Sequence, residues 1–112
     1  MESNEMPMLF LSNTEEIPGK TIVQSFGLVS GSTVRAKHVG KDIFAGLKSI
    51  VGGEIKGYTE LLNESRNEAL QRMIIDAAQR GANAVVNIRF STSTVASGAA
   101  ELLAYGTAVS VQ

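Results

Sequence analysis

Few side chains in this chain are of the types that carry out covalent chemistry. Among its 112 residues there is no cysteine and a single histidine, His38. Nucleophilic catalysis requires a nucleophile beside a base that a third group orients, and acid–base catalysis requires positioned acids or histidines. His38 has no Ser or carboxylate partner at motif spacing, and no pair of acids stands out. We therefore identify no catalytic residue, and an enzyme is the weakest of the function classes considered.

Two candidate binding residues flank a glycine-rich stretch. Residues 52–59, GGEIKGYT, have the glycine spacing of a phosphate loop, but Tyr58 stands where a nucleotide-binding loop has lysine. Free N–H groups at the start of a helix can still bind an anion, whereas the structural interpretation is a tight turn between two helices. Glu54 is a candidate ligand for a hard cation and Tyr58 a candidate hydrogen-bonding group. The alternative is that Glu54 caps or pairs locally and Tyr58 packs beside the helix.

Two arginines complete the set of candidate ligand-binding residues. Arg66 follows Leu62 by four positions, which places it on the apolar side of a helix, where a guanidinium needs a carboxylate or carbonyl partner. We expect an intersubunit salt bridge there, with Glu54 or Glu101 as the partner, and an anion site is the second interpretation. Arg89 alternates onto the polar side of a strand. It would attract anions if it lined the opening of a ring, and otherwise it is a solvated strand residue.

A metal site has one weak candidate. His38 follows Arg35 and Lys37, and a single histidine forms a metal site only if several subunits bring theirs together. A lone exposed histidine is the commoner outcome. No cofactor is predicted from these residues.

Composition excludes several partners and locations. The formal net charge is −1 and the pI is about 5.8, with no basic cluster interleaved with aromatics, so nucleic acid is not an expected partner. No segment approaches the roughly 20 apolar residues that span a bilayer. The first residues are acidic rather than basic, unlike a signal peptide. We expect one cytoplasmic domain over residues 1–112, with residues 1–7 as a flexible tail.

The longest element expected is a helix over Glu60–Arg80. Apolar residues recur there at spacings of three and four, which is typical of one buried stripe. Thr59 is the expected N-cap, and Gly81 is the expected residue after the helix, where a left-handed backbone is easiest for glycine. Glu68–Arg72 and Arg72–Asp76 are expected ion pairs. The stripe consists of Leu62, Ala69, Leu70, Met73, Ile74, Ala77 and Ala78.

Strands are expected on both sides of this helix. They cover residues 8–12, 21–30, 84–94 and 101–111, and residues 34–39 either extend the second strand or form an irregular connection. A turn is expected at Ile17-Pro18-Gly19. Gly27 and Gly31 indicate a bulge or a close approach of a neighbouring backbone. In the third strand, alternation places Val86, Ile88 and Phe90 on one face. In the last strand one face is small (Ala104, Gly106, Ala108, Ser110), so a helix or another subunit packs closely there.

These elements predict an α+β fold. It has a four-stranded, mostly antiparallel sheet, the long helix, and a short helix over Lys41–Val51 that Gly52-Gly53 ends. One helix covers only part of such a sheet. Because apolar residues remain uncovered and the last two strands carry little charge, we expect self-association into a homo-oligomer.

An ordered set of short motifs also resembles a known family of small bacterial proteins of unknown function, the YbjQ-like family, labelled "putative heavy-metal-binding". The resemblance covers residues 8–111, and it implies a subunit like that of dodecin, assembled into a ring that is expected to be a pentamer. A soft metal prefers thiolate or thioether ligands, so the residues themselves give the metal label little support. The motifs are Ile17-Pro18-Gly19, GLVSG at 27–31, DIFAG at 42–46, Gly52-Gly53-Glu54, Tyr58-Thr59, Arg66, GANAVV at 81–86 and YGTAV at 105–109.

The function expected from the sequence is therefore a non-enzymatic ring-forming module that binds a small ligand or ion at subunit interfaces. The alternative is a purely structural or partner-docking oligomer with no ligand, in which the polar residues named above make assembly contacts.

Overall fold

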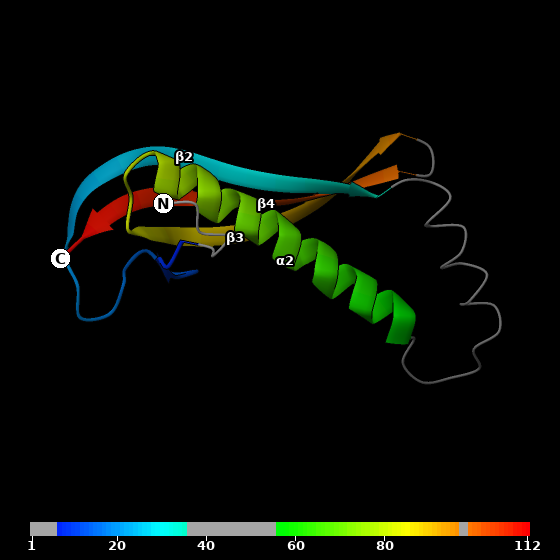
Figure 1. Cartoon of the computed structure of the whole chain (residues 1–112), viewed down its shortest axis with the longest axis horizontal. Helices are drawn as coiled ribbons and strands as arrows, with labels where there is room; N and C mark the ends of the chain where they lie inside the picture. The colour runs from blue at the N-terminus through cyan, green and yellow to red at the C-terminus, as the bar shows by residue number, and fades with distance from the viewer. Residues whose placement is uncertain (1–6, 36–55, 97–98) are drawn as a thin grey trace.

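One long helix lies across one face of a four-stranded sheet (Figure 1). The computed structural model describes residues 7–35, 56–96 and 99–112. The sheet has the order β1-β3-β4-β2, with β1 parallel to β3 and the other neighbours antiparallel. The predicted α+β class and mostly antiparallel sheet are therefore confirmed, while the predicted short helix over Lys41–Val51 lies outside the described residues. The elements are β1 (Phe10–Leu11), β2 (Ile22–Arg35), α2 (Lys56–Gln79), β3 (Ala84–Ala96) and β4 (Ala99–Val111).

The C-terminal end of α2 is the one that the sequence predicted. Gly81 has a φ of 91°, the left-handed conformation that glycine adopts without steric cost. Its N–H donates to the Ala78 carbonyl at 3.0 Å, and the Ala82 N–H donates to the Ala77 carbonyl at 3.1 Å. These two bonds form a Schellman motif, which satisfies carbonyls that the end of the helix would leave unpaired.

The N-terminal end of α2 differs from the prediction. The helix begins at Lys56, so Thr59 lies within it and is not the N-cap. No proline stands between Lys56 and Thr59 to stop the helix from extending toward the N-terminus. Thr59 is therefore a favourable capping residue that the helix does not use, because the helix begins three residues earlier, at Lys56.

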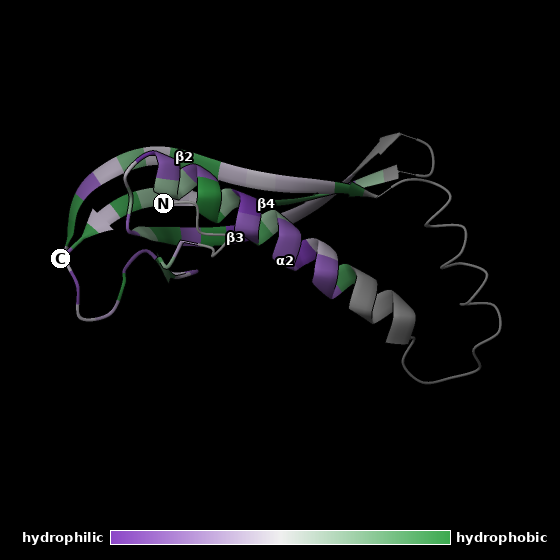
Figure 2. Ribbon diagram, in the orientation of Figure 1, coloured by the Kyte–Doolittle hydropathy of each residue, from purple (hydrophilic) through white to green (hydrophobic). Residues whose placement is uncertain are grey.

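Helix α2 packs on the sheet through a row of side chains spaced by four. Ser65, Ala69, Met73 and Ala77 are buried, and Met73 is 0% exposed. Figure 1 shows the C-terminal half of α2 close to the sheet and its N-terminal end leading away from it. The C-terminal half also carries more hydrophobic residues than the first described turns (Figure 2). The helix therefore contributes to the core mainly through its C-terminal half.

Small residues allow this close packing. Ala104 and Ala108 of β4 are fully buried in the same cluster as Ala69 and Met73, so the small face of the last strand accommodates the helix. A Cβ at Gly31 of β2 would collide with the backbone of α2 at Ala69 and Met73. Gly31 therefore marks the closest approach of the helix to the sheet, which is one of the two roles predicted for it.

Register shifts in β2 and β3 change which face the strand residues occupy; besides those at Ile22/Gln24 and Thr94/Ala96, each strand has one at a residue with positive φ. In β2 the register shifts between Ser25 and Gly27, and Gly27 has a φ of 89°, so the predicted bulge is confirmed. In β3 the register shifts between Val86 and Arg89, around Asn87, whose φ is 56°. The prediction that side chains of this strand alternate without interruption, with Val86, Ile88 and Phe90 on one face, was therefore wrong. Because the bulge inserts a residue, Val85 and Ile88 share the helix-side core, while Val86 lies in the cluster on the opposite face.

The face of the sheet opposite α2 is partly covered by the connection between β1 and β2. Ile17 is buried against Val86, Val109 and other residues of that face. The turn predicted at Ile17-Pro18-Gly19 holds it there: the Lys20 N–H donates to the Ile17 carbonyl at 3.0 Å, and Gly19 has a φ of 77°. This connection also positions the groove described next.

Candidate functional site

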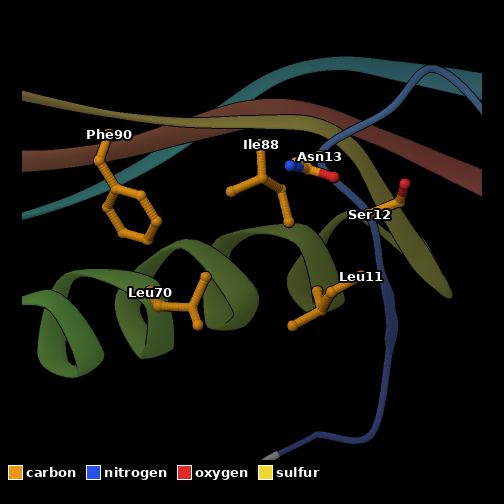
Figure 3. Close-up of a pocket in the computed structure, with 6 residues that line it drawn as sticks. All are labelled: Leu11, Ser12, Asn13, Leu70, Ile88 and Phe90. Atoms are coloured by element: carbon orange, nitrogen blue, oxygen red, sulfur yellow. The ribbon is translucent and has the colours of Figure 1, made fainter.

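A shallow apolar groove of about 180 Å³ lies between the helix, strand β3 and the segment that follows β1 (Figure 3). Its walls are mainly large apolar side chains, and Leu11 and Phe90 are 41% and 42% exposed. In Figure 3, Phe90 and Ile88 extend from β3 toward Leu70 of the helix. The groove can therefore take an apolar group from outside the chain. Its lining residues are Leu11, Ser12, Asn13, Leu70, Ile88 and Phe90.

Backbone hydrogen bonds hold the polar side of this groove in place. The Ser12 N–H donates to the Val85 carbonyl at 3.0 Å, and the Ile88 N–H donates to the Ser12 carbonyl at 3.1 Å. The Asn87 N–H donates to the Thr14 carbonyl at 2.8 Å, just at the bulge of β3. The bulge thus lets β3 pair with Ser12 and Thr14 and keeps Ile88 directed into the groove.

Arg89 is the predicted candidate that the structure connects to the groove. Its Nη1 donates to the Asn13 carbonyl at 2.6 Å and to the Ile88 carbonyl at 3.0 Å. Both acceptors belong to residues that line the groove. Arg89 is exposed, and these bonds give it a positioning role: it fastens the segment containing Asn13 to β3.

Arg66 is exposed in the single chain, so it is not buried against its own sheet, and the predicted intersubunit salt bridge stays a prediction. Its Nη1 donates to the side-chain Oδ1 of Asn63 at 3.2 Å, one turn away on the same helix. Viewed along the helix axis, Arg66 does point in nearly the same direction as Met73, seven residues later in the helix. That direction meets solvent at Arg66, which is exposed, and the core at Met73, which is fully buried. The N-terminal end of α2 leads away from the sheet (Figure 1).

The other predicted site residues are not brought to the groove by the described part of the chain. Glu54 and His38 lie outside the described residues. Tyr58 lies in the first turns of α2, where the backbone alone is described. The four candidate ligand residues therefore do not form one described cluster, and Arg66 and Arg89 have separate partners.

The described residues do not supply the donor set of a heavy-metal site. They contain no group of three or more His, Cys, Asp or Glu side chains close enough to hold an ion. The chain has no cysteine; of the described methionines, Met73 is fully buried in the core and Met8 is a single exposed thioether. Soft metals prefer thiolate and thioether sulfur. These residues therefore do not fit such a metal.

A charged row on α2 lies along the outer edge of β2. Arg72 Nη1 donates to the Ser32 carbonyl at 2.5 Å, Arg80 Nη1 donates to the Phe26 carbonyl at 3.3 Å, and the Ser30 N–H donates to Asp76 Oδ2 at 3.4 Å. Arg72 also pairs with Glu68 at 2.7 Å, as predicted. The predicted pair Arg72–Asp76 is replaced by Asp76–Arg80 at 3.2 Å, because the Arg72 guanidinium is directed to the strand instead.

Sequence reasoning did not identify the groove. Its lining comes from three separate stretches of chain, and the bulge at Asn87 decides which β3 side chains enter it. Leu70 and Phe90 were identified as apolar residues of their own elements, but their proximity depends on how the helix crosses the sheet. The one available signal was Asn87 itself, since asparagine tolerates a left-handed backbone better than most residues do.

Comparison with known proteins supports the resemblance seen in the sequence. Residues 9–112 match a family model with the description "Putative heavy-metal-binding". A bacterial UPF0145 protein of Hahella chejuensis is 64% identical over 101 residues, which cover 90% of this chain and 97% of that protein. The UPF0145 protein DET1617 of Dehalococcoides mccartyi is 57% identical over 104 residues, which cover 93% of this chain and 100% of that protein.

A solved structure shares the fold. It is a protein of unknown function from Pediococcus pentosaceus, described as a member of the DUF74 family, with a TM-score of 0.57 and 16% sequence identity. The match covers 93% of this chain and 98% of that chain. Among the residues that the structure describes, no helix is long and apolar enough to cross a membrane.

Proposed function

This chain belongs to the YbjQ family, and from that premise we propose that it is a non-enzymatic homo-oligomeric module that holds a small ligand or ion where two copies meet. The family resemblance favours a closed ring of five copies. A ring requires each subunit to present two different surfaces to its neighbours. The proposal therefore needs at least one surface that a single copy leaves incomplete.

The observation that carries the proposal is the exposed apolar surface around the groove. Leu11 and Phe90 are each about two-fifths exposed at its rim, beside the half-buried Leu70. Burying apolar area is worth roughly 25 cal/mol per Å², so covering these side chains would favour association. The neighbouring copy would cover this surface, and a small ligand would lie at its edge, near Asn13.

A second candidate is an oligomer with no ligand, which docks partners or serves as structure. The observation that favours it is that both described candidate arginines already have partners within the chain. Arg66 bonds to Asn63, and Arg89 bonds to the carbonyls of Asn13 and Ile88. In this alternative the polar candidates only support the fold and the assembly.

Native mass spectrometry of freshly purified protein separates the two candidates. The mass of the intact assembly gives the number of copies, and the same sample after denaturation gives the mass of the bare chain. We expect an assembly with an additional mass at fixed stoichiometry. A bare assembly would favour the alternative, and a monomer at micromolar concentration would refute both.

Calorimetric titration with Zn²⁺, Ni²⁺ and Cu²⁺ tests the ion. Because the described residues contain no group of three or more His, Cys, Asp or Glu side chains that could hold such an ion, we propose that the ligand is not one of these ions, and we expect no heat above that of buffer. A saturable heat would assign the ion to residues outside those described here.

The groove is tested with the substitution Phe90→Ser. We expect it to shift the assembly toward smaller species in sedimentation velocity, because it removes an exposed apolar ring from the proposed interface. Leu28→Ser is the matched control: Leu28 is 67% exposed on β2, away from the groove. Equal assembly of both variants and the parent protein would exclude the groove as the interface.

A further inference from the structure

Strand β3 has an outer edge that is paired only at its beginning. Strand β1 pairs with Ala84 and Val85, and the Ser12 and Thr14 carbonyls accept hydrogen bonds from the Ile88 and Asn87 N–H groups. From Phe90 to Ala96 no described strand pairs with this side of β3. We call this outer side of residues 90–96 the open edge.

From Phe90 to Thr94, before the register shift at Thr94/Ala96, the open edge presents backbone groups in a regular pattern. The Ile88 N–H points outward, toward Ser12, and backbone groups of an extended strand alternate in direction. The N–H and carbonyl groups of Phe90 and Thr92 therefore also point outward, while those of Ser91 point toward β4. Residues 90–93 are exposed. Unpaired outward groups of this kind are a template for another extended chain.

The other edge of the sheet is covered. Strand β2 is the opposite outermost strand, and the side chains of Arg72, Asp76 and Arg80 bond to its outward groups at Ser32, Ser30 and Phe26. Arg72 and Asp76 lie in α2, and Arg80 directly follows its last residue; the three are four apart, so they lie along one side of the helix. Charged side chains over an edge strand oppose the addition of a further strand. Side chains of the helix region thus cover one edge, whereas within residues 7–35, 56–96 and 99–112 no strand pairs with residues 90–96 of the other.

We infer that the open edge of β3 takes an extended segment of a second copy of this chain, which pairs with it by backbone hydrogen bonds. This inference rests on the proposed homo-oligomer and names the contact through which it forms. Residues 90–96, FSTSTVA, carry no charge, so a neighbouring copy meets no like-charge repulsion there. Phe90 lies both on this edge and in the groove, so the paired segment would also cover the exposed apolar surface.

Amide hydrogen exchange on the unaltered protein tests the contact directly. The protein is compared at concentrations above and below dissociation of the assembly. We expect the Thr92 amide to exchange about tenfold or more slowly in the assembly, because it gains a hydrogen bond. The outward amide of Leu28, on the covered edge, is the internal control and should exchange at the same rate in both. Equal Thr92 rates in an intact assembly would overturn the inference while the proposed oligomer stood.

The substitution Thr92→Pro provides the second test. Proline removes the outward N–H without removing a bond to β4, and an edge strand tolerates it at such a position. We expect a dissociation constant for the assembly about tenfold higher than that of Thr92→Ala, which keeps the N–H. Circular dichroism checks that both variants are folded. Folded Thr92→Pro protein that assembles like Thr92→Ala would overturn the inference, and a parent protein that never assembles would remove the proposed function as well.

Discussion

The contact between α2 and the sheet at Gly31 can be tested by adding a single methyl group. In Gly31→Ala the new Cβ would lie 2.6 Å from the Cβ of Arg72 and would collide with the backbone at Ala69 and Met73. Carbon atoms in ordinary contact are about 3.8 Å apart, so the helix would have to retreat by roughly 1 Å. The obstacle is mainly helix backbone, which cannot move aside as a flexible side chain can.

The expected cost follows from this geometry. Overpacking a core position by a methyl group costs typically about 1–3 kcal/mol, and the upper end applies because the whole helix must move. For a domain of this size, about 3 kcal/mol lowers the melting temperature by roughly 10–15 °C. The assay is thermal unfolding followed by circular dichroism at one fixed protein concentration, because assembly makes the melting temperature depend on concentration.

Gly27 provides a matched control in the same strand. A Cβ there meets nothing within 4 Å, but φ is 89°, so alanine would cost about 1–2 kcal/mol through backbone strain alone. Asparagine tolerates this backbone, so Gly27→Asn should be milder than Gly27→Ala. At Gly31 space is limiting, and Gly31→Asn should be worse than Gly31→Ala. A cost below about 1 kcal/mol for Gly31→Ala, or rescue of Gly31 by asparagine, would refute the reasoning.

Substitutions at three further positions probe local contacts. Asn83→Ala should cost about 1–3 kcal/mol in urea unfolding, because the Asn83 side chain bonds to both the N–H and the carbonyl of the buried Val111, at 2.8 and 2.9 Å; an unchanged midpoint would contradict this. Asn87→Val should lower the free energy of unfolding by about 1–2 kcal/mol, because valine is strained in the left-handed backbone at position 87. Asn87→Gly should change it by less than about 0.5 kcal/mol, because glycine adopts that backbone without strain. Equal values for the two variants would show that the backbone at position 87 does not select the residue. Arg89→Ala should cost about 1 kcal/mol and speed amide exchange at Asn87, because the carbonyl of Asn13 loses its partner; unchanged exchange would show that Arg89 does not hold this segment.

Much of the secondary structure could be predicted because its signals are local. The row of Ala69, Met73 and Ala77 in α2, the glycine after the helix and the Pro18-Gly19 turn depend on residues within a few positions of one another, whereas the buried Ser65 was not predicted. Backbone sterics and capping bonds act over that range. The extension of β2 to Arg35 was left open by the sequence, and pairing with β4 as far as Ala100 decided it.

The candidate site was predicted less well. Arg89 does lie beside the groove, but its role is to hold Asn13, and Arg66 is exposed rather than buried. The periodicity that placed Arg66 on the apolar side gave its direction from the helix axis correctly. Whether a side chain in that direction meets the core or the solvent depends on how the helix crosses the sheet. The spacing of apolar residues in the sequence does not indicate how the helix crosses.

By itself, the sequence determined which segments are helix and strand, where the helix ends and that the last strand has one small face. The tertiary structure alone decided that α2 fills this face and that the bulge at Asn87 turns Ile88 toward the groove. It also decided that charged side chains cover the edge of β2, while no strand among the described residues pairs with the end of β3 on its outer side. The physical reason is the separation in sequence between the residues that interact. Propensity and capping are settled between near neighbours in the chain, whereas faces, edges and grooves are settled by contacts between segments that are far apart in the sequence.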